Sequence, residues 1–275
     1  MKVTPWEVSG TIDYKKLITK FGLQHMKGLP KTFQENVLFR RGLIFAHRDF
    51  PQILDTIKNK KRFAMMTGLM PSGKFHFGHK MVADQIVFYQ KLGAKIYLTV
   101  ADVEAYNSRN ANLKELHKTA IEEYLTNYVA LGLDLKKCDF YFQSQRSKDG
   151  KKASAYYSLA NMLGRHVTYN EFKSIYGEVS PGKLSASLLQ AADMLHPQLM
   201  EFEKPLPVVV PVGADQDPHL RLARDLSKRI KLHKFKTLSS TYHKFMPGLK
   251  GGKMSSSDEN SYIALSEKPE DVAKK

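Results

Sequence analysis

Residues 63–80, FAMMTGLMPSGKFHFGHK, pass from an apolar run to a turn and then to helical spacing. The run at residues 63–67 is short and apolar, as in a buried strand. Pro71 and Gly73 follow it, and both residue types favour turns. From residue 79 to residue 92, apolar residues recur at the spacing of one helix face. The stretch therefore predicts a strand, a turn and a helix in succession.

The alternation of strand and helix continues along the chain. Strands that are apolar on both faces form parallel sheets with helices on both sides, so the sequence predicts an α/β fold with a doubly wound parallel sheet. The further predicted strands are residues 95–101, 139–142 and 206–212, and the further predicted helices are residues 112–131 and 217–230.

The histidines of the opening stretch lie where such a sheet binds ligands. A parallel sheet takes its ligands beyond the carboxyl ends of its strands. A helix that begins there offers backbone N–H groups to an anion, and Gly78 leaves room for a flat ring or a phosphate to approach. His76 and His79 lack the spacing and the glutamate of a zinc protease. Taken alone, the pair fits nucleotide chemistry or a polar turn.

Two later segments could also contact a nucleotide. GGKMSSS, residues 251–257, joins a lysine and serines to glycines that let a loop move. The Lys253 ammonium could stabilise a departing pyrophosphate, and the serines could donate to phosphate oxygens, although a flexible basic surface loop would have the same composition. GADQDP, residues 213–218, follows a predicted strand and opens a predicted helix. Its Asp215 is placed to accept hydrogen bonds from ribose hydroxyls.

The composition is that of an ordinary globular protein with an unusual charge. The 275 residues are 42% hydrophobic and 25% charged, enough for one sizeable core. The net charge of +16 and the pI near 9.6 favour a polyanionic partner, or else a solubilising surface. The single cysteine, Cys138, excludes an intramolecular disulfide and a cysteine-based zinc site, and it fits a reducing cytoplasm. The sequence shows neither a signal peptide nor a run long enough to span a membrane.

HFGH at residues 76–79 and KMSSS at residues 253–257 resemble the His-x-Gly-His and Lys-Met-Ser-x-Ser signatures of the class I aminoacyl-tRNA synthetases. The likeness runs almost end to end and points to the archaeal form of the tryptophanyl-tRNA synthetases. It implies a Rossmann-type catalytic domain at residues 61–275, with a mainly helical insertion at about 106–200 and a mobile loop at 249–258. Residues 1–60 resemble the family's N-terminal extension through PWEV at 5–8, IDY at 12–14, FRRG at 39–42 and HRD at 47–49.

The resemblance implies ATP-dependent activation of L-tryptophan and its transfer to tRNA(Trp). The amino-acid carboxylate attacks the α-phosphate of ATP, and the aminoacyl group then passes to the terminal ribose of the tRNA. This chemistry depends on positioning and charge stabilisation, with Mg²⁺ held mainly by ATP and water. The resemblance assigns catalysis to His76, His79, Lys253, Ser255 and Ser257, and ATP binding to Thr67, Ser72, Gly78, Asp215 and Met254.

The resemblance also implies an amino-acid pocket. Gln190 and Asp193 are three residues apart, so on a helix both can face one cavity. Gln190 suits the substrate ammonium, and Asp193 could accept a hydrogen bond from the indole N–H. Tyrosine enzymes have an Asp at the same place, so a tyrosyl-tRNA synthetase of the same subclass stays an alternative. The residues assigned to this pocket are Met66, Thr99, Glu104, Gln190, Asp193 and Gln216, although eukaryotic tryptophan enzymes have Tyr and Gln in place of Met66 and Thr99, and an aromatic residue in place of Ala186.

The family dimerises through the insertion, so we expect a homodimer. The chain ends at Lys275, soon after KMSSS, so we expect no anticodon-binding domain. Either the chain is a catalytic fragment, or this polypeptide does not read the anticodon. Two other classes share part of the pattern. A small-molecule nucleotidyltransferase would have His-x-Gly-His without the later loop, extension and insertion, and a non-catalytic tRNA-binding paralogue would lack signature residues that are present here.

Overall fold

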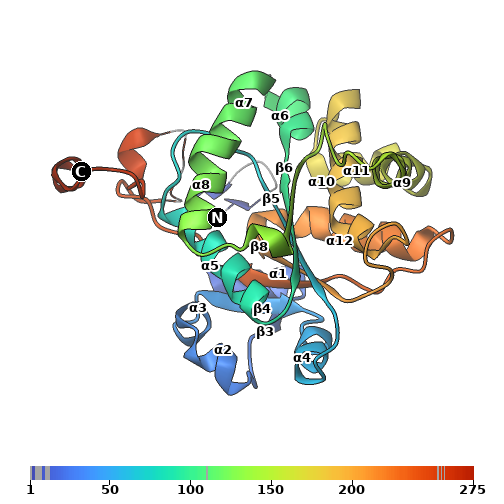
Figure 1. Cartoon of the computed structure of the whole chain (residues 1–275), viewed down its shortest axis with the longest axis horizontal. Coiled ribbons are helices and arrows are strands. Elements are labelled where there is room, and N and C mark those ends of the chain that lie inside the picture. Colours follow the sequence, from blue (N-terminus) through green and yellow to red (C-terminus); the bar gives the residue numbers. More distant parts are fainter. Residues whose placement is uncertain are drawn as a thin grey trace.

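The computed structural model describes most of the chain, and Figure 1 shows helices arranged around a central sheet. The predicted catalytic residues Lys253, Ser255 and Ser257 lie outside the described part. The residues that the structure describes are 2–3, 8–9, 13–109, 111–252, 254, 256 and 258–275.

The main sheet has seven strands in the order β3-β4-β9-β8-β5-β6-β7. Strands β9, β8, β5, β6 and β7 are parallel to one another, whereas β4 pairs antiparallel with β3 and with β9. From β5 the chain builds β6 and β7 on one side and then β8 and β9 on the other, so the predicted doubly wound α/β fold is confirmed. The strands are β3 (Gln24–His25), β4 (Ile44–Arg48), β5 (Ala64–Leu69), β6 (Lys95–Val100), β7 (Cys138–Phe142), β8 (Val208–Gly213) and β9 (Ser239–His243), with β1 (Lys2–Val3) and β2 (Val8–Ser9) in a separate two-stranded sheet.

The central strands are apolar throughout because both of their faces are covered. Val208 and Val210 of β8 contact one hydrophobic cluster, and Val209 between them contacts a second cluster on the opposite face. Ala64 and Met65 of β5 are divided between the same clusters. Full burial of a valine or leucine side chain is worth about 1.5–3 kcal/mol, so both layers of helices contribute to the stability of the sheet.

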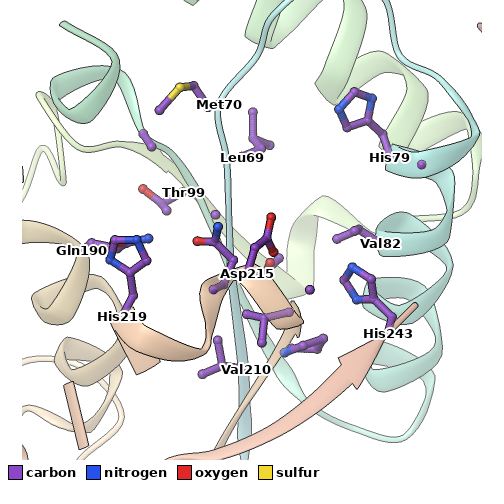
Figure 2. Close-up of a pocket in the computed structure, with 18 of the residues that line it drawn as sticks. Leu69, Met70, His79, Val82, Thr99, Gln190, Val210, Asp215, His219 and His243 are labelled. Carbon is purple, nitrogen blue, oxygen red and sulfur yellow. The ribbon is translucent and has the colours of Figure 1, made fainter. Parts of the chain in front are cut away.

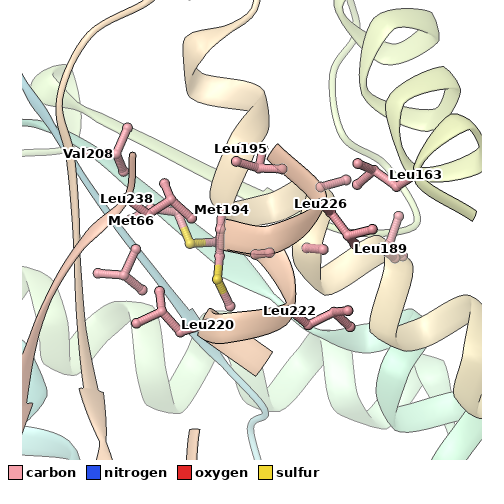
Figure 3. Packing of buried hydrophobic residues seen from close by; sticks show 14 of the residues in the cluster. Met66, Leu163, Leu189, Met194, Leu195, Val208, Leu220, Leu222, Leu226 and Leu238 are labelled. Carbon is pink, nitrogen blue, oxygen red and sulfur yellow. The ribbon is translucent and has the colours of Figure 1, made fainter. Parts of the chain in front are cut away.

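Two helices of the first cluster hold one wall of the ligand site. Figure 3 shows leucines of α11 (Pro181–Leu195) and α12 (Asp217–Arg229) packed together and against Met66 of β5. The second cluster includes Met81, Ile86 and Tyr89 of α5. The sheet and these packed helices thus form a rigid base for the strand ends.

The predicted helices at 79–92 and 217–230 are present as α5 and α12, whereas 112–131 is divided. It consists of α7, a π-helical turn named η1, and α8; π-helical turns are rare and occur mostly at functional sites. Besides α11 and α12, the helices are α1 (Tyr14–Phe21), α2 (Lys31–Glu35), α3 (Val37–Arg40), α4 (Pro51–Lys58), α5 (Phe77–Lys91), α6 (Asp102–Arg109), α7 (Leu113–Thr119), η1 (Ala120–Leu125), α8 (Thr126–Ala130), α9 (Gly150–Leu163), α10 (Tyr169–Tyr176) and α13 (Pro269–Lys274).

The strand order places a crevice between β5 and β8. The chain leaves the carboxyl end of β5 through the 70–76 loop into α5, and it leaves β8 through a short 3₁₀ turn, η5 (Ala214–Gln216), into α12. Because the connections from these neighbouring strands lead to opposite sides of the sheet, their carboxyl ends form the switch point at which such sheets bind ligands.

Candidate active site

A cavity of about 410 Å³ opens at this switch point, a volume suited to a small ligand. Figure 2 shows His79 on one side of the cavity, Gln190 on the opposite side and Asp215 between them. All of the predicted site residues that the structure describes line the cavity. They are Met66, Thr67, Ser72, His76, Gly78, His79, Thr99, Glu104, Gln190, Asp193, Asp215, Gln216 and Met254.

The rings of both signature histidines accept backbone hydrogen bonds at the start of α5. The Gly78 N–H donates to His76 Nδ1 over 3.1 Å, and the His76 N–H donates to His79 Nδ1 over 3.2 Å. The rings stack with their centroids 3.9 Å apart. Because both Nδ1 atoms accept, each neutral ring carries its proton on Nε2. A side chain at Gly78 would place Cβ 2.8 Å from His76 Cε1, so the glycine makes room for the histidine ring.

The described part of the KMSSS segment reaches the same cavity. Met254 and Ser256 both line it, and Ser256 Oγ lies 2.8 Å from Ser72 Oγ. Gly73 has a φ of +63°, and a Cβ there would lie 2.8 Å from the carbonyl oxygen of Ser256. The two signatures, far apart in the sequence, therefore face one cavity across a closely packed contact between backbones.

Asp215 occupies the middle of the cavity wall, directly after β8. A Cβ at Gly213 would lie 2.6 Å from Asp215 Oδ1 and 2.9 Å from the Phe245 ring. The glycine therefore lets the carboxylate fold back across the end of the strand. An acidic group at this place in a Rossmann-type sheet is suited to the hydroxyls of a ribose.

The side of the cavity opposite His79 has a buried acceptor without a partner. Gln190 Oε1 is buried, and within the described residues it has no hydrogen-bond partner. His219 lines the same cavity. His219 Nδ1 lies 2.9 Å from the Tyr176 hydroxyl, and burial lowers the pKa of His219 to about 4, so this imidazole is neutral at pH 7. A buried unpaired acceptor costs about 1–3 kcal/mol, which a ligand with N–H or O–H donors would recover.

Asp193 is buried behind the same side and receives three hydrogen bonds. The hydroxyls of Tyr141 and Tyr156 each donate to Oδ1 over 2.7 Å, and Gln143 Nε2 donates to Oδ2 over 2.7 Å. Burial raises the pKa of Asp193 to about 6, although these donors act in the opposite direction. A carboxylate has about four acceptor positions, so protein groups occupy most of them. The sequence did not predict this support.

The lining residues that were not predicted include the polar side chains of Gln143, His219 and His243. Gln143 directly follows a predicted strand, and its position at a carboxyl end was a usable signal. Its Oε1 accepts from the Glu104 N–H over 3.2 Å while its Nε2 donates to Asp193, so it links the predicted pocket residues. His243 lies on β9, a strand that the sequence did not predict.

The described residues contain neither a candidate metal site nor a membrane-spanning helix. Across the part of the chain that the structure describes, no group of three or more His, Cys, Asp or Glu side chains could hold a metal ion. None of the described helices combines the length and the apolar character needed to cross a membrane.

A doubly wound sheet whose switch point is lined by both signature segments defines a class I aminoacyl-tRNA synthetase. The family of tRNA synthetases class I (W and Y) matches residues 58–275, and the chain belongs to this family.

The similar proteins place the chain in the tryptophan branch. It is 48% identical to the tryptophan–tRNA ligase of Methanocaldococcus jannaschii, with 100% of this chain and 74% of the relative covered. It is 46% identical to that of Aeropyrum pernix, with 98% and 72% covered. The crystal structure of the Aeropyrum pernix tryptophanyl-tRNA synthetase matches with a TM-score of 0.88 at 45% identity, covering 95% of this chain and 71% of that one. The chain belongs to the tryptophan–tRNA ligases, and the tyrosyl alternative is not retained.

Proposed function

We infer that the chain is a tryptophan–tRNA ligase, which activates L-tryptophan with ATP, releases pyrophosphate and transfers the tryptophanyl group to tRNA(Trp). Its membership of the tryptophan–tRNA ligases supports the reaction. The structural observation that carries the inference is the meeting of both signatures at one cavity, with His76 and Ser256 among its lining residues. One triphosphate can therefore contact both segments.

At the phosphate end, we propose that the protein stabilises charge without taking a proton from the substrate. His76 and His79 border the ATP phosphates and the adenosine. His76 donates to phosphate from Nε2 because its Nδ1 accepts the Gly78 N–H, whereas both nitrogens of His79 are bound within the protein. Lys253 stabilises the departing pyrophosphate together with Ser255 and Ser257. Phosphoryl transfer needs in-line positioning and charge neutralisation more than acid–base catalysis.

We propose that the adenosine lies across the middle of the cavity. Asp215 accepts from the ribose hydroxyls, and Gly78 lies against the adenine. Thr67, Ser72 and Met254 complete the ATP contacts; all of these residues line the cavity.

We propose that tryptophan lies on the side opposite the signature histidines. Gln190 Oε1, buried and unpaired, accepts from the substrate ammonium, and Glu104 contributes negative charge there. The remaining acceptor position of Asp193 takes the indole N–H, while Tyr141 and Tyr156 fix the carboxylate. Met66, Thr99 and Gln216 complete the pocket wall.

The remaining parts of the proposal concern partners. ATP enters as its magnesium complex, with the ion held by phosphate oxygens and water. The charge of +16 supports attraction of tRNA. We also propose a cytoplasmic homodimer. It pairs through the helices of the predicted insertion at about 106–200, a segment that also contributes β7 to the sheet of the catalytic domain at residues 61–275.

ATP–pyrophosphate exchange with each of the twenty amino acids tests the reaction and the choice of substrate together. We expect exchange with tryptophan and a rate at least about a hundredfold lower with tyrosine, because a mispaired buried polar group discriminates strongly. Exchange with no amino acid, or equal exchange with tyrosine, would reject the proposal. Charging of tRNA(Trp) then tests the second step.

A further inference from the structure

The π-helical turn η1 joins α7 to α8 and faces the 70–76 loop. Two consecutive residues of the turn, Glu123 and Tyr124, both contact that loop. π-helical turns are rare, and they are frequently found at functional sites. No part of the ATP or tryptophan contacts above uses these side chains.

Glu123 and Tyr124 hold the backbone of the loop at both of its ends. Glu123 Oε1 accepts the Phe75 N–H over 2.8 Å. The Tyr124 hydroxyl donates to the Ser72 carbonyl over 3.1 Å and lies 3.3 Å from the Ser72 N–H, from which it accepts. Tyr124 is fully buried, whereas Ser72 is exposed, so these bonds are half-buried.

The same hydroxyl also meets the second signature histidine. His79 Nδ1 accepts the His76 N–H, so the proton of the neutral ring is on Nε2, and Nε2 donates to the Tyr124 hydroxyl over 3.3 Å. A phenol hydroxyl can donate one hydrogen bond and accept two. Tyr124 makes all three, to Ser72 twice and to His79 once.

The loop that Tyr124 holds is also the loop that contacts the KMSSS segment. Ser72, whose backbone bonds Tyr124, places its Oγ 2.8 Å from Ser256 Oγ. A displacement of Ser72 would therefore alter the position of Ser256 as well as the support of His79. A single hydroxyl on the insertion thus bears on both signatures.

We propose that Tyr124, with Glu123, is a positioning residue for adenylate formation: its hydroxyl accepts from His79 Nε2 and so holds the ring, and the two side chains hold the Ser72–Phe75 backbone in the geometry that meets the KMSSS segment. The proposal rests on the proposed function, because the reaction that the two residues position is the attack on ATP. Neither residue touches the reacting atoms.

Tyr124→Phe tests the hydroxyl, and Tyr128→Phe is its matched control. Both tyrosines are buried, and both rings meet the Phe75 ring edge-on, with centroids 5.5 Å and 5.3 Å away. In the described part of the chain, only Tyr124 of these two bonds the loop. We expect Tyr124→Phe to lower kcat of tryptophan-dependent exchange by about tenfold to a hundredfold and to leave KM for tryptophan within about twofold. Tyr128→Phe should leave kcat within about twofold.

Glu123 supplies a second, independent pair of variants. Glu123→Gln keeps an acceptor for the Phe75 N–H and should retain most of kcat, whereas Glu123→Ala should lose about tenfold. Glu122→Ala is the control, since that side chain is 65% exposed and pairs only with Lys118 in the described structure.

¹⁵N chemical shifts of His79 provide a readout that does not depend on activity. The wild type should show a hydrogen-bonded Nε2–H, and in Tyr124→Phe the Nε2 shift should move to that of a ring without this bond, while Nδ1 still accepts the His76 N–H. Equal kcat in the two Phe variants, or an unchanged Nε2 shift, would overturn the positioning role while wild-type exchange upheld the ligase. Loss of exchange in the wild type would reject the ligase itself, and the Nε2 shift would still decide the positioning of His79.

Discussion

Arg48 of β4 forms an ion pair with Asp217 at the start of α12, with Nε 2.9 Å from Oδ1. Asp217 is completely buried and also accepts from the Tyr242 hydroxyl. The pair joins a segment near the beginning of the chain to the turn that carries Asp215. The N-terminal strands therefore support one wall of the active site as well as the edge of the sheet.

Arg48→Ala should lower the free energy of unfolding by about 1–3 kcal/mol, because it removes two charged donors from a buried carboxylate that Tyr242 and Arg221 then hold alone among the described residues. The control is Arg62→Ala. Arg62 also pairs with a carboxylate, that of Glu203, but its side chain is 71% exposed, compared with 15% for Arg48. An exposed pair contributes about 0–1 kcal/mol. Urea unfolding of both variants measures the difference, and equal losses would contradict a structural role for the buried pair.

Gly78→Ala should lower kcat for adenylate formation by about tenfold or more, because the new Cβ would force the His76 ring out of its position on the helix. Gly150→Ala is the matched control: it also lies in the first turn of a helix, α9, and no atom lies within 4 Å of the place that its new Cβ would take. Pyrophosphate exchange measures both variants. A Gly78→Ala enzyme as active as the control would show that the ring position does not matter.

Asp193 should make the stability of the protein depend on pH between about 4 and 6. Its pKa is raised from 3.8 to about 6 in the folded protein, so the folded state binds the proton more tightly than the unfolded state. The corresponding stability is present below pH 4 and is lost as the pH rises through about 6, by about 3 kcal/mol.

Urea unfolding of the wild type and of Asp193→Asn at several pH values isolates this effect. The asparagine variant should lose the slope between pH 4 and 6, whatever its constant offset in stability. That offset should be unfavourable, because an amide offers one acceptor oxygen to donors that bind both oxygens of the carboxylate. Identical slopes in the two proteins would assign the pH dependence to other groups.

Gln190→Ala should raise KM for tryptophan by about tenfold to a hundredfold, because it removes an acceptor that has no other hydrogen-bond partner in the described residues. KM for ATP serves as the internal control and should stay within about twofold. Equal increases in both constants would mean that Gln190 supports the cavity as a whole and does not bind the ammonium.

The apolar runs of the sequence located the parallel strands β5, β6, β7 and β8, because these strands are buried on both faces and carry few polar residues. Strand β9 was not predicted in this way. Its Ser239, Ser240 and Thr241 are fully buried, yet a run of hydroxyl residues does not resemble a core strand in sequence. Burial there depends on neighbours from β4 and β8, which no local pattern reveals.

The residues of the site also divide into those that the sequence can predict and those that it cannot. Residues directly after apolar strands, such as Asp215 and Gln143, can be found from the end of the strand alone. The three donors to Asp193 and the contact of Tyr124 with the 70–76 loop could not be predicted, because each joins segments brought together only by the folded chain. The division of the predicted helix 112–131 by a π-turn belongs to the same group, since that turn serves a tertiary contact.

Lys253→Ala should slow adenylate formation by about a hundredfold or more and leave tryptophan binding within about twofold. Two residues that follow the KMSSS lysine support this prediction, because Met254 and Ser256 line the cavity that also contains His79. A lysine that meets charge on the leaving pyrophosphate acts in the transition state, so its removal lowers kcat without weakening the ground state. Pyrophosphate exchange measures the rate and calorimetry measures tryptophan binding.

The control is Lys250→Ala, which changes a nearby lysine with a 58% exposed side chain that pairs with Asp258. Comparable losses in rate and in binding, or a control as impaired as Lys253→Ala, would argue that the lysine only attracts anions to this side of the molecule.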